Sequence, residues 1–141
     1  MIKAQLLKTF LIYVFILFFA YTGFYKVLHL DAFKFNIART AVFPEYFINI
    51  IPYGVIALEF TVIFFLMYKK KTGVILFAIS MLVFSIYIIL LYKYGRYEVC
   101  GCGGVLNGLE FKYHLIINII FLLLALSVIY LNHKIKTNYG L

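Results

Sequence analysis

The stretch TFLIYVFILFFAYTGFY, residues 9–25, decides the fold because it holds no charged residue between Lys8 and Lys26. A helix that crosses a bilayer needs about 20 predominantly apolar residues. Apolar neighbours on both sides extend this run to about residues 7–28. Because lipid offers the backbone no hydrogen-bond partners, we predict that the run is a membrane-spanning helix.

Three further apolar runs follow, at about residues 48–68, 72–92 and 113–131, and the first of these is interrupted only by Glu59. The 141 residues are 66% hydrophobic and 13% charged, which leaves too few charges to cover the surface of a soluble domain. We therefore predict an all-α integral membrane four-helix bundle that forms a single domain over residues 1–141.

The first run might be mistaken for a cleaved signal peptide, since Lys3 and Lys8 give it a basic start. It is longer than the apolar region of a signal peptide, and no A-x-A cleavage site follows it. We expect it to be retained as the first helix.

The basic residues predict the orientation of the bundle. Four helices place both termini on one side, together with the Lys69-Lys70-Lys71 cluster in a minimal turn. Lys and Arg divide almost evenly between the two sides, but those on this side have no acidic residues among them. The positive-inside rule then places both termini in the cytoplasm and the loops at about residues 29–47 and 93–112 outside. The formal charge of +8 is thus read as a topology signal, and nucleic acid is excluded as a partner.

The first external loop is too charged to cross a membrane. Its Phe33, Ile37 and Val42 are spaced to share one side of a short helix at the membrane interface. Pro44 and Pro52 mark breaks, and Pro52 suits the first turn of the second spanning helix.

The second external loop contains YEVCGCGGVLNG, residues 97–108, with the chain's two cysteines, Cys100 and Cys102. An external pair can form a disulfide. A bridge across one residue requires a turn at Gly101, and it should be strained and therefore labile. So small a ring would stabilise the fold little, which favours a redox-active pair over a structural one.

Basic residues near the pair influence its reactivity. Lys93 and Arg96 favour the thiolate, whereas Glu98 opposes it. Two other interpretations stay open: two unconnected structural thiols, and a Cu(I) or zinc site. The loop is not apolar, which disfavours the first. Two sulfurs cannot complete a tetrahedral zinc site, and His114 is the only imidazole nearby in sequence.

Glu59 is the only acidic residue inside a predicted span, where a carboxylate usually faces a partner or a cavity. If the second helix begins near Pro52, Glu59 lies about 10 Å below the outer surface and Lys26 can reach it. If the helix begins near Tyr46, Glu59 lies past the midplane and no pair is expected. A structural clamp and a role in proton handling both remain open.

Other polar residues are interpreted more simply. His29, one turn after Lys26, is expected to be interfacial rather than a catalytic base. Small and amide side chains commonly join membrane helices. Three such residues are read as helix packing: Ser80, Ser85 and Asn118.

Several segments together resemble known membrane proteins. FAYTGFYKVLHLDAFKFNI, residues 19–37, resembles the G-x-x-K stretch of DoxX-like proteins, and Pro52 with Glu59 resembles their P…E element. CGCGG, residues 100–104, is similar to the C-G-C-F-G loop of the MauE branch, although Gly103-Gly104 stands where Phe-Gly is expected. The resemblance covers nearly the whole chain in order and spacing.

This resemblance implies a DoxX-like four-helix bundle in the bacterial cytoplasmic (inner) membrane, associated with periplasmic redox work. MauE is linked to maturation of a disulfide-rich dehydrogenase subunit, together with a thioredoxin-like partner. The matching positions here are Gly23, Lys26, Glu59, Cys100 and Cys102. The family does not fix the substrate, and methylamine metabolism is not assumed.

The sequence thus predicts a membrane thiol–disulfide redox protein that serves a periplasmic thioredoxin-fold protein or a secreted client. Cys100 and Cys102 would carry the chemistry, supported by Gly101, Lys26, Glu59 and Arg96. No cysteine lies within a span and no second pair exists, so the electrons go either to a quinone or to a partner. The alternative is a non-enzymatic anchor or scaffold subunit of a larger envelope complex.

Overall fold

The computed structural model describes residues 2–97, 106 and 108–138, and it is helical throughout most of them. No strand occurs within these ranges. The helices, in chain order, are α1 (Ile2–Leu28), α2 (Leu30–Thr40), α3 (Glu45–Ile48), α4 (Ile51–Tyr68), α5 (Lys70–Lys93) and α6 (Phe111–Asn138).

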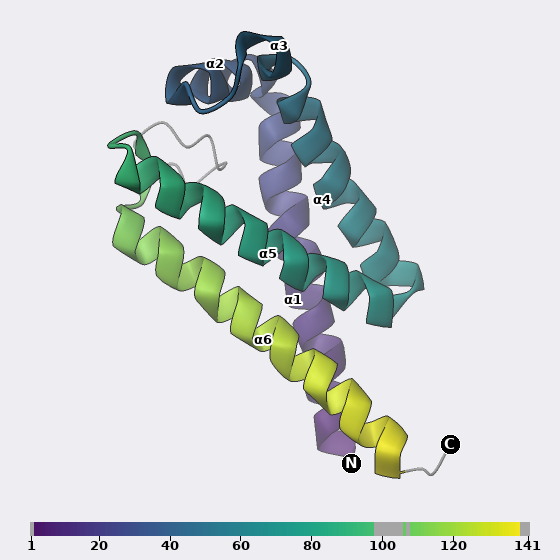
Figure 1. Ribbon diagram of the computed structural model, residues 1–141. Helices are drawn as coiled ribbons and strands as arrows, with labels where there is room; N and C mark the ends of the chain where they lie inside the picture. Colours follow the sequence, from purple (N-terminus) through teal and green to yellow (C-terminus); the bar gives the residue numbers. More distant parts are fainter. Residues whose placement is uncertain (1, 98–105, 107, 139–141) are drawn as a thin grey trace.

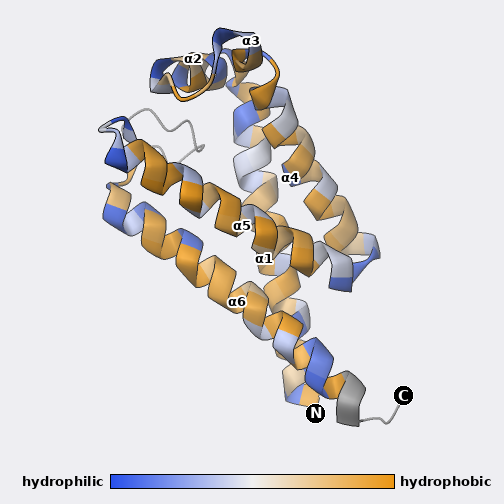
Figure 2. Cartoon of the chain, viewed as in Figure 1, coloured by the Kyte–Doolittle hydropathy of each residue, from blue (hydrophilic) through white to orange (hydrophobic). Residues whose placement is uncertain are grey.

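Four of these helices are long and apolar enough to cross a membrane: α1, α4, α5 and α6. Figure 2 shows that these helices consist mostly of hydrophobic residues, with many of the hydrophilic residues near the helix ends and in α2. The prediction of an all-α membrane protein with four spans is therefore confirmed. The helices α1 and α6 extend beyond the predicted apolar runs, because a helix does not end where its residues become polar.

The helices form a bundle that is covered at one end (Figure 1). Helices α2 and α3 lie across the C-terminal end of α1 and the N-terminal end of α4. Helices α5 and α6 run side by side, and α1 packs against both α4 and α6. We call the end beneath α2 and α3 the capped end. The N-terminal end of α1 and the C-terminal end of α6 lie together at the opposite end.

The segment between α1 and α4 is thus mostly helical rather than an irregular loop. Phe33 and Ile37 lie one turn apart on one side of α2, as the sequence predicted, and both are buried because this side faces the bundle. Val42 lies beyond this helix, which ends where Ala41 adopts a left-handed conformation with φ of 49°.

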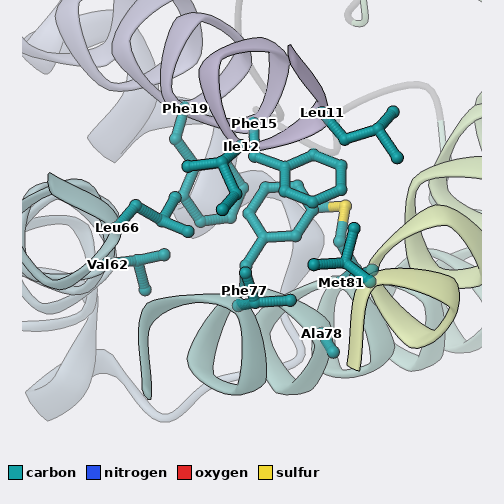
Figure 3. Packing of buried hydrophobic residues seen from close by; sticks show 12 residues of the cluster. Leu11, Ile12, Phe15, Phe19, Val62, Leu66, Phe77, Ala78 and Met81 are labelled. Carbon is teal, nitrogen blue, oxygen red and sulfur yellow. The ribbon is translucent and has the colours of Figure 1, made fainter. Parts of the chain in front are cut away.

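An apolar core fills the middle of the bundle (Figure 3). The rings of Phe15 and Phe77 stack with centroids 4.4 Å apart, and Phe19 lies 4.6 Å from Phe77. These three rings join α1 to α5. The apolar core is completed by residues from all four spans: Leu11, Ile12, Val62, Leu66, Val74, Ala78, Met81, Ala125 and Val128.

Helices α4 and α5 meet in a tight turn at Lys69, and Gly73 makes this possible. A Cβ atom at Gly73 would lie 2.6 Å from the Cα of Leu66 and 2.6 Å from the carbonyl carbon of Phe65. Real Cβ atoms essentially never approach backbone so closely. Glycine therefore allows the first turn of α5 to lie directly on the last turn of α4.

Candidate functional site

A buried ion pair joins α1 to α4 at the capped end. The Nζ atom of Lys26 lies 2.6 Å from Oε1 of Glu59, and the residues are 4% and 1% exposed. Thr22 Oγ1 also donates to Oε1, at 3.1 Å. The pair forms because α4 begins at Ile51, next to Pro52, so Glu59 lies within reach of Lys26. The sequence had left this contact undecided.

Gly23 allows the carboxylate to approach α1. A Cβ atom at this position would lie only 3.3 Å from Oε2 of Glu59. Gly23 and Lys26 are three residues apart and lie on one face of the helix. One turn of α1 therefore provides both the space for the Glu59 carboxylate and the positive charge that pairs with it. Within the described part of the chain, Oε2 is buried and has no hydrogen-bond partner.

A cavity of about 160 Å³ opens beside this pair. Helices α1, α2, α4, α5 and α6 all contribute to its walls, which are mainly apolar and aromatic. Five buried polar side chains also line it, and we call them the polar cluster: Thr22, Lys26, Glu59, His114 and Asn118. A cavity between spanning helices that combines apolar walls with polar groups is typical of a ligand site.

The α6 side of the polar cluster consists of His114 and Asn118, which are each 2% exposed. Tyr97 has one hydroxyl proton, which it donates to the carbonyl oxygen of Leu109 at 2.7 Å. Its oxygen lies 3.0 Å from Nδ1 of His114, so it accepts a hydrogen bond from the N–H group at that nitrogen. In the neutral imidazole this arrangement places the proton on Nδ1 and leaves Nε2 as an acceptor.

The sequence interpretation did not place His114 and Asn118 together at a cavity. Asn118 was read as helix packing, and His114 was considered only as a metal ligand. Their spacing of four residues on an apolar helix could have indicated a shared polar face. Within the described ranges, no three His, Cys, Asp or Glu side chains lie close enough to hold a metal ion.

Arg96, which follows the C-terminal end of α5, contacts α2 at the capped end. Its Nη1 atom donates to the backbone oxygen of Thr40, the last residue of α2, at 2.8 Å. Arg96 therefore holds the start of the second loop against α2, which is a contact that the sequence did not predict. Its predicted influence on the thiols remains a prediction.

The predicted cysteine motif, Cys100-Gly101-Cys102, lies outside the described residues. Tyr97 and Leu106 are described residues on either side of this motif. Tyr97 contacts His114, and Leu106 is 8% exposed and lines the cavity. Tyr97, which contacts the polar cluster, and Leu106, which lines the same cavity, are thus the described residues that flank the cysteine motif.

His29 does not join this site. Its side chain is exposed, its Nδ1 atom lies 3.1 Å from the backbone oxygen of Tyr25, and its ring stacks on the Tyr25 ring at 4.3 Å. It is not among the residues that line the cavity.

A comparison with known protein families gives a match over most of the chain. The family model described as methylamine utilisation protein MauE matches residues 4–131. This chain belongs to the MauE family. The match runs from α1 to α6 and includes the Lys26–Glu59 pair and both cysteines. No curated protein and no solved structure matches the chain significantly.

Membership of the MauE family and four apolar helices identify a multi-pass membrane protein. The lipid bilayer is therefore one partner of this chain. The wider resemblance to DoxX-like proteins, the inner membrane of a bacterium and the outward-facing cysteine loop remain predictions.

Proposed function

We propose that this MauE-family protein is a membrane thiol–disulfide redox protein that acts in the maturation of envelope proteins. Cys100 and Cys102 would exchange disulfides with a periplasmic thioredoxin-fold protein or a secreted client. One observation carries the proposal: of the described residues that flank the two cysteines, Tyr97 contacts the buried polar cluster and Leu106 lines its cavity.

The chemistry needs no other residue type. A thiolate attacks one sulfur of a disulfide and forms a mixed disulfide, and the second thiolate of the pair then resolves it. Two electrons pass between the pair and the partner, and two S–H bonds form on the side that is reduced. Gly101 supports this cycle because glycine allows the turn that a bridge between the two cysteines requires.

His114 would assist the exchange. In its neutral form Nε2 carries a lone pair, which can accept a thiol proton, and the hydrogen bond from Nδ1 to Tyr97 orients the ring. The covalent chain tethers Cys100 three residues from Tyr97 and Cys102 four residues from Leu106. This tether supports a location of the thiols close to His114.

The test is to trap the mixed disulfide. We would express Cys100→Ser and Cys102→Ser separately, quench intact cells with acid, alkylate free thiols and analyse the membrane fraction without reductant. The variant that retains the attacking cysteine should accumulate a covalent complex with an envelope protein, which reductant should dissolve. The double variant C100S/C102S is the control and should form none.

The same strains separate the proposal from the scaffold alternative. A redox protein should lose its cellular function in the C100S/C102S double variant, whereas an anchor subunit should keep it. If neither single variant traps a partner and the double variant remains fully functional, the thiol–disulfide proposal is wrong.

A further inference from the structure

We propose that the cavity at the capped end binds the ring of a membrane quinone. The binding site stands on the structure of the cavity alone. The use of that quinone as the oxidant of the Cys100–Cys102 pair also rests on the proposed function.

The size and walls of the cavity suit one six-membered ring. An apolar protein cavity of about 150 Å³ takes up benzene, and this cavity measures about 160 Å³. Six Phe and Tyr side chains from four segments line it: Phe18, Phe19, Phe33, Phe43, Phe84 and Tyr87. Aromatic rings stack favourably on a flat conjugated ligand.

The polar groups match the two oxygens of a quinone. The Lys26 ammonium has three N–H groups, and among the described residues it uses one of them, toward Glu59. The others can donate to one quinone carbonyl. On the α6 side, the amide of Asn118 can donate to the second, and His114 lines the same wall.

Glu59 also offers a hydrogen-bond acceptor to a quinol, the reduced form of the quinone. Its Oε2 atom is buried without a hydrogen bond, although the residue is only 1% exposed. Buried polar atoms in native structures nearly always have a partner, so this atom indicates a missing one. A quinol hydroxyl can donate to this oxygen, whereas a purely apolar lipid tail cannot.

The charges favour a neutral ligand. Lys26 and Glu59 cancel one another at 2.6 Å, so the cavity offers no net charge to attract an anion such as phosphate. Val83 lines the cavity and is 51% exposed, which shows that the cavity reaches the surface of α5. A prenyl tail can leave there into the lipid.

The proposed redox step balances. Two thiols and one quinone give one disulfide and one quinol. Two S–H bonds break, one S–S bond forms, and both electrons and both protons move to the two quinone oxygens. The chain has no second cysteine pair, and a direct transfer to quinone does not require one.

Binding is tested without any redox chemistry. The C100S/C102S double variant, purified as the full chain in lipid nanodiscs, would be photolabelled with an azidoquinone and mapped by mass spectrometry. We expect labelling at cavity residues and its loss in excess decylubiquinone. Decylbenzene, which has a ring and tail but no carbonyl oxygens, should compete at least tenfold less well. Equal competition by decylbenzene would overturn the proposal in favour of an apolar chain.

Paired variants locate the site. Val55→Phe fills the cavity, whereas Val27→Phe adds the same volume on the exposed face of α1. Val55→Phe should reduce labelling at least tenfold and Val27→Phe should not. Likewise, Asn118→Leu should weaken quinone binding, while His133→Leu, at an exposed position near the other end of α6, should leave it unchanged. If these pairs behave alike, the quinone does not bind in the cavity.

The redox step is measured separately. The reduced wild-type protein should convert anaerobic decylubiquinone to one quinol per disulfide formed. If the quinone labels the cavity but no quinol appears, the binding site stands and its role as oxidant is wrong. If no mixed disulfide is trapped while quinol does form, the proposed exchange with a protein partner fails instead.

Discussion

The apolar core and the capped end of this bundle are built from opposite kinds of side chain. In the apolar core, stacked rings such as Phe15 and Phe77 fill the space between helices. At the capped end, Lys26, Glu59 and His114 are equally buried but surround a cavity. Because burying charges within a bilayer is expensive, such groups are usually functional. The comparison suggests that the apolar core provides stability and the capped end provides chemistry.

The largest loss of stability is expected when the Lys26–Glu59 ion pair at the capped end is disrupted. Lys26→Met leaves Glu59 buried without its cation, which should destabilise the protein by about 3–5 kcal/mol. The double variant K26M/E59L removes both charges and should recover most of this loss, since an apolar pair often replaces a buried ion pair without cost. Unfolding in mixed micelles would measure both.

Lys112→Met is the matched control, because Lys112 is exposed at the same end of the bundle. Its free energy of unfolding should change by less than about 0.5 kcal/mol. A loss at Lys112 as large as that at Lys26 would contradict the account.

A change in the α4–α5 turn should reduce stability without changing the chemistry. Gly73→Ala forces a Cβ atom against the backbone of Leu66, so we expect a loss of about 1–3 kcal/mol, as in other overpacked sites. The reactivity of Cys100 and Cys102 should remain that of the wild type. Thermal unfolding and thiol labelling of the same sample would show whether the two regions are independent.

Gly54→Ala is the control for this variant, because a Cβ atom there meets nothing within 4 Å. It should be stabilising by up to about 1 kcal/mol, the usual preference of a helix for alanine over glycine.

Loss of the Arg96 contact should reduce the stability by a smaller amount. Arg96→Met removes the hydrogen bond to the Thr40 carbonyl, which should lower the free energy of unfolding by about 1 kcal/mol. Cysteine alkylation should become faster, because the start of the loop is no longer held against α2. The control is Arg39→Met, whose guanidinium lies over the ring of Phe35 at 5.6 Å. Unchanged alkylation in the Arg96 variant would show that this contact does not order the segment.

The smallest change in stability is expected for a substitution at Gly23. Alanine there should gain about 1 kcal/mol of helix propensity, but its Cβ atom would press on Oε2 of Glu59 at 3.3 Å. The two contributions should nearly cancel, so that Gly23→Ala is less stable than Gly54→Ala by about 1 kcal/mol. Equal stabilisation by the two substitutions would mean that Glu59 moves aside easily and that the capped end is not rigid.

The sequence predicted the four spans well, because an apolar run of about 20 residues has few stable structures other than a membrane-spanning helix. It could not decide the Lys26–Glu59 contact, since that depended on whether the second helix began near Tyr46 or near Pro52. The chain in fact forms the short helix α3 first and begins α4 at Ile51. A shift of a few residues in this start decides the depth of Glu59.

The contacts of Tyr97 and Arg96 were beyond sequence reasoning for a different reason. Tyr97 meets His114 and the carbonyl of Leu109, and Arg96 meets the carbonyl of Thr40. Backbone acceptors have no residue signature, and the partners lie up to 56 positions apart. Only the placement of helices fixes such pairs.

The central claim is that Cys100 and Cys102 form an external, exchangeable disulfide, and one measurement tests it most directly. Intact cells would be treated with a membrane-impermeant maleimide of high mass, before and after mild reductant, and quenched with acid. We predict no labelling at first and labelling of both thiols from outside after reduction. Immediate labelling as free thiols would contradict a stable disulfide, and labelling only after the membrane is broken would contradict the proposed orientation.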